Sequence, residues 1–192
     1  MRVLIACEFS GIVRDAFAAK GHDAWSCDLL PTERPGQHIQ DDVLKHFDDG
    51  WDLMIAHPPC THLAVSGAPH FKRKQDGRQE EALQFVRLLL DAPINRIALE
   101  NPVSIISTRI RKPSQIIQPY MFGHPERKTT CLWLKGLPKL RETNNVKAEF
   151  DALPENKKNP KHYLPPSKDR WKLRSLTYQG IANAMADQWG SL

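Results

Sequence analysis

The sequence predicts an α/β domain built on a mostly parallel sheet, with helices on both faces of that sheet. Short apolar runs alternate with segments of helical periodicity through the first half of the chain, which is the pattern of consecutive βαβ units. Four of these runs lead into polar or reactive residues, as expected where parallel strands end at one functional edge. The 192 residues suit a single domain of this class, spanning residues 1–192.

Apolar runs and helical periodicity place the individual elements. The expected strands cover residues 3–6, 24–27, 52–56, 96–99 and 129–135. The expected helices cover residues 12–20, 43–47, 79–90 and 178–189. Gly21 would stop the first helix, and Asp42 would cap the second. Residues 61–78 are expected to form a long loop with a basic patch at 72–74.

The positive charge of the chain lies in one late segment. Residues 139–174 contain 10 Lys or Arg and 5 Asp or Glu, whereas the rest of the chain contains 17 of each, so this segment holds the whole net charge of +5. The segment is rich in proline and is expected to be loop-rich. It could be an arm that contacts nucleic-acid phosphates or a solvated loop whose charge serves solubility, and composition leaves both interpretations open.

The sequence predicts no membrane partner. No apolar run approaches the roughly 20 residues that span a bilayer. The first residues are too short a run for a signal-peptide core and are typical of a first strand. We therefore expect a cytoplasmic protein.

Cys60 differs from the other three cysteines, which lie in apolar runs. It follows Pro58-Pro59 in a loop just beyond an expected strand, and the two prolines stiffen the approach to the thiol. A thiol near basic groups at such an edge can have a lowered pKa and act as a nucleophile. Glu100, at the next strand end, could serve as its acid partner.

A metal site is not expected. The four cysteines form no CxxC pair and suggest no disulfide framework. A site around Cys60 would need the histidines His57, His62 and His70. Their spacing matches no standard zinc pattern, and a single cysteine is available.

Two further strand ends carry features of a nucleotide site. Gly11 closes the turn Glu8-Phe9-Ser10-Gly11 between the first strand and the first helix, where a helix N-terminus offers free N–H groups and glycine permits close approach of a ligand. Asp28 ends the second strand, where a carboxylate commonly binds ribose hydroxyls. Taken alone, each feature is more often an ordinary turn or loop.

Six segments, in chain order, resemble motifs of the cytosine-C5 DNA methyltransferases. Residues 57–67 resemble the family's nucleophile loop, because Ser66-Gly67 follow Cys60 at the family's spacing. Residues 99–102 resemble the Glu-Asn-Val motif that carries the family's acid. The other matches are residues 9–11, Asp28 with Asp42, residues 122–128 and residues 179–184. The resemblance covers nearly the whole chain, whose length is that of compact members from bacteriophages.

The resemblance implies a Rossmann-like class I methyltransferase fold, S-adenosylmethionine as cofactor, and DNA, duplex or single-stranded, as partner. It implies that Cys60 attacks carbon 6 of cytosine, that Glu100 holds or protonates N3, and that Lys128 supports the nucleophile loop or a nearby phosphate. Residues 139–174 would stand in place of a full target-recognition domain, which leaves a minimal recognition region. The implied cofactor-binding residues are Phe9, Ser10, Gly11, Asp28, Asp42, Pro58 and Asn183.

Departures from the family pattern keep other functions open. The cofactor loop continues with Ile12-Val13-Arg14 instead of further glycines, and Thr61 and Thr130 replace the family's Gln and Arg. The short recognition region also suits a free cytosine nucleotide or single-stranded DNA, and steep salt dependence would instead indicate duplex binding. A non-catalytic relative that binds DNA or the cofactor, and transfer of a group other than methyl, are the remaining alternatives.

Overall fold

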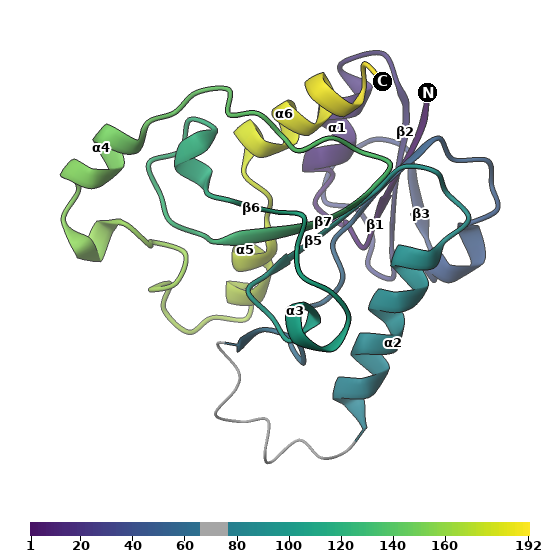
Figure 1. Cartoon of the computed structure of the whole chain (residues 1–192), viewed down its shortest axis with the longest axis horizontal. Coiled ribbons are helices and arrows are strands. Elements are labelled where there is room, and N and C mark those ends of the chain that lie inside the picture. Colours follow the sequence, from purple (N-terminus) through teal and green to yellow (C-terminus); the bar gives the residue numbers. More distant parts are fainter. Residues whose placement is uncertain (66–76) are drawn as a thin grey trace.

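Seven strands form one sheet in the part of the chain that the computed structural model describes, residues 1–65 and 77–192 (Figure 1). The strands are β1 (Arg2–Ala6), β2 (Asp23–Asp28), β3 (His38–Gln40), β4 (Leu53–Ala56), β5 (Ile97–Pro102), β6 (Gln115–Ile117) and β7 (Thr130–Lys135). Their order is β3-β2-β1-β4-β5-β7-β6, with β1 to β5 parallel and β7 antiparallel to both of its neighbours. The order reverses between β1 and β4, and open parallel sheets bind ligands at the carboxyl ends of the strands that flank such a reversal.

Helices cover both faces of the sheet. They are α1 (Ile12–Ala18), α2 (Arg78–Asp91), α3 (Ile106–Arg109), α4 (Lys147–Ala152), α5 (Arg170–Ser175) and α6 (Gln179–Trp189), with 3-10 helices η1 (Val43–His46), η3 (Pro119–Met121) and η4 (Glu155–Lys157). α1 and α6 pack on one face around Phe17 and Trp189, and α2 and α3 pack on the other around Leu83 and Ile106. The predicted fold class, a Rossmann-like α/β domain with a mostly parallel sheet, is confirmed. No helix within the described ranges has the length and apolarity to cross a membrane.

The long elements expected from periodicity are present, and the elements that the sequence did not reveal are short. β3, β6 and α3 have three or four residues each, too few to show a period. β5 continues to Pro102 because β7 pairs with it antiparallel through Glu100 and beyond. Asp42 caps η1 as predicted, accepting a hydrogen bond from the Leu44 N–H at 3.1 Å. The predicted basic patch at 72–74 lies outside the described residues.

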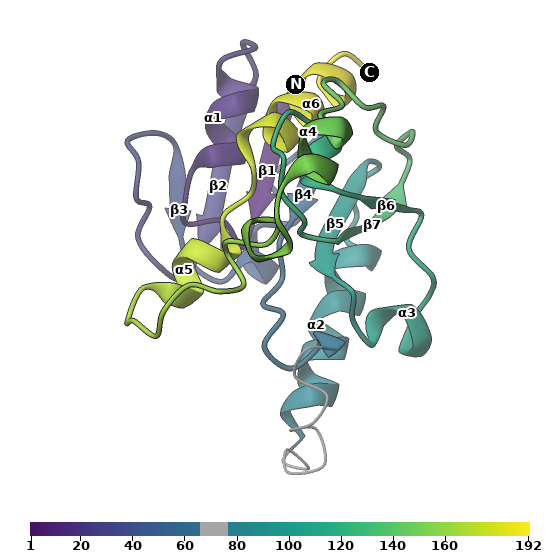
Figure 2. The same cartoon turned by 90° about the vertical axis from the view of Figure 1, so that its left-hand side faces the viewer.

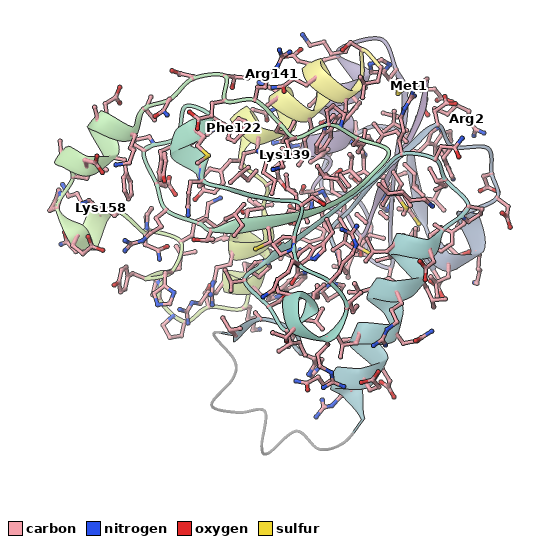
Figure 3. The ribbon with its side chains drawn as sticks, viewed as in Figure 1. Met1, Arg2, Phe122, Lys139, Arg141 and Lys158 are labelled. Carbon is pink, nitrogen blue, oxygen red and sulfur yellow. The ribbon has the colours of Figure 1, made fainter. Side chains whose placement is uncertain are left out.

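The basic segment 139–174 is loop-rich, as predicted, and contains α4, η4 and α5. Lys139 and Arg141 lie beside α6, whereas Lys158 lies on the far side of the molecule near α4 (Figure 3). The end of the segment takes a different course, because α5 lies close to the carboxyl ends of β1, β2 and β3 (Figure 2). The charges of the segment therefore do not form one continuous surface.

Gly180 joins the last helix to the loop that precedes β7. Its N–H donates to His124 Nε2 at 3.0 Å. A Cβ added at Gly180 would lie 1.9 Å from the carbonyl oxygen of Phe122, so only glycine leaves room for this approach. The two motifs predicted at 122–128 and 179–184 are therefore in direct contact.

Replacing this glycine should destabilise the fold. We expect Gly180→Ala to lower the free energy of unfolding by about 3 kcal/mol, because the new methyl group overlaps a fixed carbonyl. Urea unfolding measures the change. The control is Gly21→Ala, where φ is +82° and nothing lies within 4 Å of an added Cβ, so that the backbone strain alone should cost about 1 kcal/mol. Equal costs for the two variants would contradict the packing argument.

Candidate functional site

Two neighbouring strand ends bring His57, Glu100 and Cys60 together. β4 and β5 pair in parallel with Ala56 opposite Leu99, so His57 and Glu100 follow side by side. His57 Nδ1 lies 3.1 Å from Glu100 Oε2, and the two side chains are 12% and 17% exposed. Cys60 lies three residues beyond His57 in an exposed turn.

Asn101 ties the loop that carries Cys60 to the end of β5. Its Nδ2 donates to the Pro58 carbonyl oxygen at 2.9 Å in a buried hydrogen bond. A second link joins the same two segments, because the Val65 N–H donates to the Val103 carbonyl oxygen at 3.1 Å. The position of Cys60 relative to Glu100 is therefore fixed by main-chain and amide hydrogen bonds.

Glu100 is held in its ionised form. Burial by itself would raise the pKa of this carboxyl group. The hydrogen bond and the positive charge of His57, with a smaller effect of Lys128, outweigh burial and hold the pKa of Glu100 below its ordinary value. The site thus contains an ionised carboxylate that is hydrogen-bonded to a histidine.

The Cys60 thiol does not have the lowered pKa that the sequence suggested. Although the residue as a whole is exposed, burial of its thiol raises the pKa, and the negative charge of Glu100 raises it further. Lys128 and Arg174 act in the opposite direction but do not outweigh these two effects. That expectation was wrong because Glu100, proposed as the acid partner, is itself a negative charge beside the thiol.

Lys128 lies within electrostatic reach of Glu100 and Cys60, but its hydrogen bond goes to a different part of the chain. Its Nζ donates to the Leu176 carbonyl oxygen at 3.1 Å. Burial lowers the pKa of Lys128, while the charges of Glu100 and Cys60 partly restore it. Lys128 is thus a partly buried cation within electrostatic reach of both predicted reactive groups.

The first βα turn is built around Glu8. Its buried carboxylate accepts hydrogen bonds from the N–H groups of Val13 at 2.7 Å and Arg14 at 3.2 Å. These are donors at the start of α1, and a helix N-terminus leaves such donors without partners inside the helix. The prediction that they are free for a ligand was therefore wrong, because a side chain of the same turn already binds them.

The residues after Glu8 contact the end of the basic segment. Phe9 and Ser10 are buried, and Gly11 has a φ of +73°. The Trp171 ring on α5 lies 5.6 Å from the Phe9 ring, centroid to centroid, and 52% of Trp171 is exposed. Lys172 Nζ lies 5.6 Å from the centroid of the same Phe9 ring. The predicted cofactor loop is therefore covered on one side by α5.

The remaining predicted cofactor residues are not all together. Asp28 is the last residue of β2 and is paired with Gln40 of β3, and Asp42 follows two residues later, so both lie at the ends of these strands. Burial raises the pKa of Asp28. Asn183 is exposed on α6, where its Oδ1 accepts a hydrogen bond from Gln179 Nε2 at 2.9 Å. No hydrogen bond within the described ranges joins Asn183 to the other predicted residues.

Three residues gain roles that the sequence did not reveal: His57, Asn101 and Trp171. His57 entered the sequence argument as a possible metal ligand and as the first residue of the segment that resembles the nucleophile loop, without a catalytic role of its own. The signal that could have found it is its position: it directly follows one expected strand, just as Glu100 directly follows the expected strand 96–99. Among the described residues, no group of three His, Cys, Asp or Glu side chains could hold a metal ion, and His70 lies outside those residues.

Comparison with known proteins adds little to this geometry. The sequence matches no protein-family model and no curated protein. Among 46 matching chains of solved structures is a protein provisionally described as a DNA modification methyltransferase encoded within a prophage of E. coli. It has a TM-score of 0.46 and 17% sequence identity over 81% of this chain. The chain spans 56% of the length of that protein, and a likeness of this degree carries no functional assignment.

The His57–Glu100 pair should control the protonation of the site. We expect His57→Leu to raise the pKa of Glu100, because burial is then opposed only by the smaller effect of Lys128. In the native protein the lowered pKa of Glu100 contributes stability above the ordinary carboxyl pKa, and this stability is lost as pH falls through the folded pKa. In the variant the sign reverses, so that ionisation of Glu100 destabilises the fold as pH rises.

Carbon-13 NMR of the glutamate carboxyl groups, together with unfolding free energies from pH 3 to pH 7, measures both effects. The control is the double variant His57→Leu with Glu100→Gln, which lacks the titrating carboxyl group and should lose this pH dependence. An unchanged Glu100 pKa in His57→Leu would contradict the assignment.

Alkylation can test the two opposing charges at Cys60. Iodoacetamide should label Cys60 before the other cysteines, because Cys27 and Cys131 are buried. At pH 8 we expect Glu100→Gln to speed the labelling of Cys60 and Lys128→Met to slow it, each by about threefold. Mass spectrometry of the labelled peptides gives the rates. A change in the same direction for both variants would show that the charges do not act on the thiol as described.

Proposed function

We propose that this chain is an S-adenosylmethionine-dependent methyltransferase that methylates carbon 5 of cytosine in DNA through a covalent bond to Cys60. The observation that carries the proposal is the junction of β4 and β5. It brings an exposed cysteine, whose thiol is partly buried, close to a buried carboxylate, and the Asn101–Pro58 hydrogen bond holds their two segments together. The sequence motifs around the same residues resemble those of the cytosine-C5 enzymes.

Carbon 5 of cytosine is a poor nucleophile, and the proposed chemistry makes it reactive. The Cys60 thiolate adds to carbon 6, and the electrons of the 5,6 double bond move toward N3. The ionised Glu100 takes up a proton from solvent as the base binds and donates it to N3, which neutralises this charge, while the hydrogen bond to His57 orients the carboxyl group. Carbon 5 would then bond to the methyl group while the methyl–sulfur bond of the cofactor breaks, the electron pair of that bond staying on sulfur, and carbon 5 would afterwards lose its proton to a base. The electrons of that C–H bond restore the double bond and release Cys60.

Unsatisfied polar atoms support a substrate pocket at this place. His57 Nε2 and Asn101 Oδ1 are buried and have no hydrogen-bond partner in the described part of the chain. Buried polar groups are rarely left unpaired in proteins, and exceptions are common at functional sites. Both atoms belong to residues that flank Glu100, where the proposed base would bind.

The carboxyl ends of β1 to β3 carry groups that fit the nucleoside part of the cofactor. Asp28 and Asp42 provide neighbouring carboxylates for its hydroxyl and amino groups, and Phe9 with the half-exposed Trp171 provides aromatic surface. Bound S-adenosylmethionine would supply an electrophilic methyl group. The protein's own part is to place the target carbon of the base against it and to exclude water.

Methyl transfer is the direct test. With labelled S-adenosylmethionine, we expect label on cytosine of duplex DNA and a loss of at least about a thousandfold in Cys60→Ser. Cys131→Ala is the matched control, because Cys131 is buried on β7 and should leave transfer intact. Single-stranded DNA and dCMP are tested in parallel.

The substrate that is labelled decides between the related functions. Label on dCMP alone would replace the DNA assignment with nucleotide modification by the same chemistry. Full activity of Cys60→Ser, or no binding of the cofactor, would refute the proposal.

A further inference from the structure

Two lysines converge on one carbonyl oxygen beside the proposed active site. Lys128 Nζ and Lys161 Nζ lie 3.1 Å and 3.5 Å from the Leu176 oxygen. Both also face the Tyr178 ring, at 5.9 Å and 3.7 Å from its centroid. Segments far apart in the sequence thus bring two ammonium groups to the same place.

Arg174 adds a third positive charge to this pair. Its guanidinium and the Lys128 ammonium are close enough for each cation to oppose the charge of the other, and Lys128 acts in the same way on Lys161. Lys128 and Arg174 both favour the thiolate form of Cys60. Lys128 and Lys161, joined by their shared contacts, and Arg174, within electrostatic reach of Lys128 and Cys60, together make up one cluster of positive charge near the predicted nucleophile.

The cluster makes no direct ion pair within the described residues. None of the three cations makes an ion pair with a carboxylate anywhere in residues 1–65 or 77–192, whereas Lys20, Lys45, Lys147, Lys158 and Lys172 each have such a partner. The two nearby carboxylates, Glu126 and Glu100, partly offset this positive charge, but their hydrogen bonds go to the Tyr178 hydroxyl and to His57 and not to the cations. Burial, and after it the charge of Lys128, lowers the pKa of Lys161 to about 8.

Like charges held together in a partly buried place are costly unless an anion joins them. Two ammonium groups and a guanidinium group suit a phosphate, whose several oxygens can each accept a charge-assisted hydrogen bond. We propose that Lys128, Lys161 and Arg174 form a phosphate-binding site beside Cys60. The second half of the inference rests on the proposed function: this site holds the phosphate on the sugar of the cytosine that Cys60 attacks.

The site also gives part of the basic segment a function. Lys161 and Arg174 both belong to residues 139–174, whereas Lys139 and Arg141 lie beside α6 (Figure 3) and Lys158 is paired with Glu155. The excess charge of the segment therefore serves one local contact at the active site more than a broad surface for DNA.

Calorimetry on the full chain, without cofactor, tests the phosphate site directly. The probes are deoxycytidine, dCMP and inorganic phosphate. We expect dCMP to bind about tenfold more tightly than deoxycytidine, because one charge-assisted hydrogen bond to the phosphate contributes about this much affinity. Lys161→Met should abolish this preference. Lys161→Arg, which keeps the charge, should retain most of it.

Lys158→Met is the matched control. Lys158 belongs to the same segment and also lies over an aromatic ring, at 5.2 Å from the Phe150 centroid, but it is paired with Glu155. This variant should bind dCMP like the native chain. Equal binding of dCMP and deoxycytidine by the native chain, no binding of any phosphate probe, or an unchanged preference in Lys161→Met would overturn the inference.

A short single-stranded oligonucleotide containing one cytosine identifies the source of the phosphate. If Lys161→Met weakens the binding of dCMP and inorganic phosphate alone, the site takes a terminal phosphate. If it also weakens the binding of the oligonucleotide, the site takes a phosphodiester. Both results support the site. Because no methyl transfer is involved, a phosphate preference without transfer would refute the proposed function alone. Transfer with identical KM in Lys161→Met and the native chain would refute the phosphate site alone.

Discussion

The parallel pairing of β4 with β5 is the constraint on which the candidate site depends. With Ala56 opposite Leu99, the next residue of each strand must lie beside its neighbour, and these residues are His57 and Glu100. A register shift of one residue would turn every following side chain to the other face of the sheet. β5 remains a regular strand beyond Glu100 because it pairs with β7. This pairing holds Asn101 where its side chain can hydrogen-bond to the Cys60 loop.

Buried charge gives the site its chemical character. Without His57, burial would favour the neutral, protonated form of Glu100. Without the negative groups beside it, Lys128 would lose its charge more readily, because burial lowers its pKa. The pKa of Cys60 depends on both kinds of charge. Burial and the negative charge of Glu100 raise it, and they outweigh the positive charges of Lys128 and Arg174. A bound substrate changes this balance, because a base over Glu100 and an anion among the cations alter the charges that the thiol experiences.

The C-terminal segments α5 and α6 pack against loops at the carboxyl edge of the sheet. Gly180 packs against the carbonyl group of Phe122, and Trp171 on α5 packs against Phe9 at the end of β1. Lys172 adds an ion pair to Glu33 at 3.1 Å, across most of the length of the chain. The segment that composition alone described as basic and loop-rich is thus partly a cover for the predicted cofactor loop.

The sequence by itself determined the alternation of strands and helices, the long elements, the exposed Cys60 after two prolines and Glu100 at the next strand end, because periodicity and strand-end residues are local features. It could not determine the short strands, the Glu8 contacts at the start of α1, the partner of Glu100 or the pKa of Cys60. These depend on which strands are neighbours and on the burial that packing creates. The convergence of Lys128, Lys161 and Arg174 likewise came only from tertiary structure, since electrostatic interactions act through space between residues far apart in the chain.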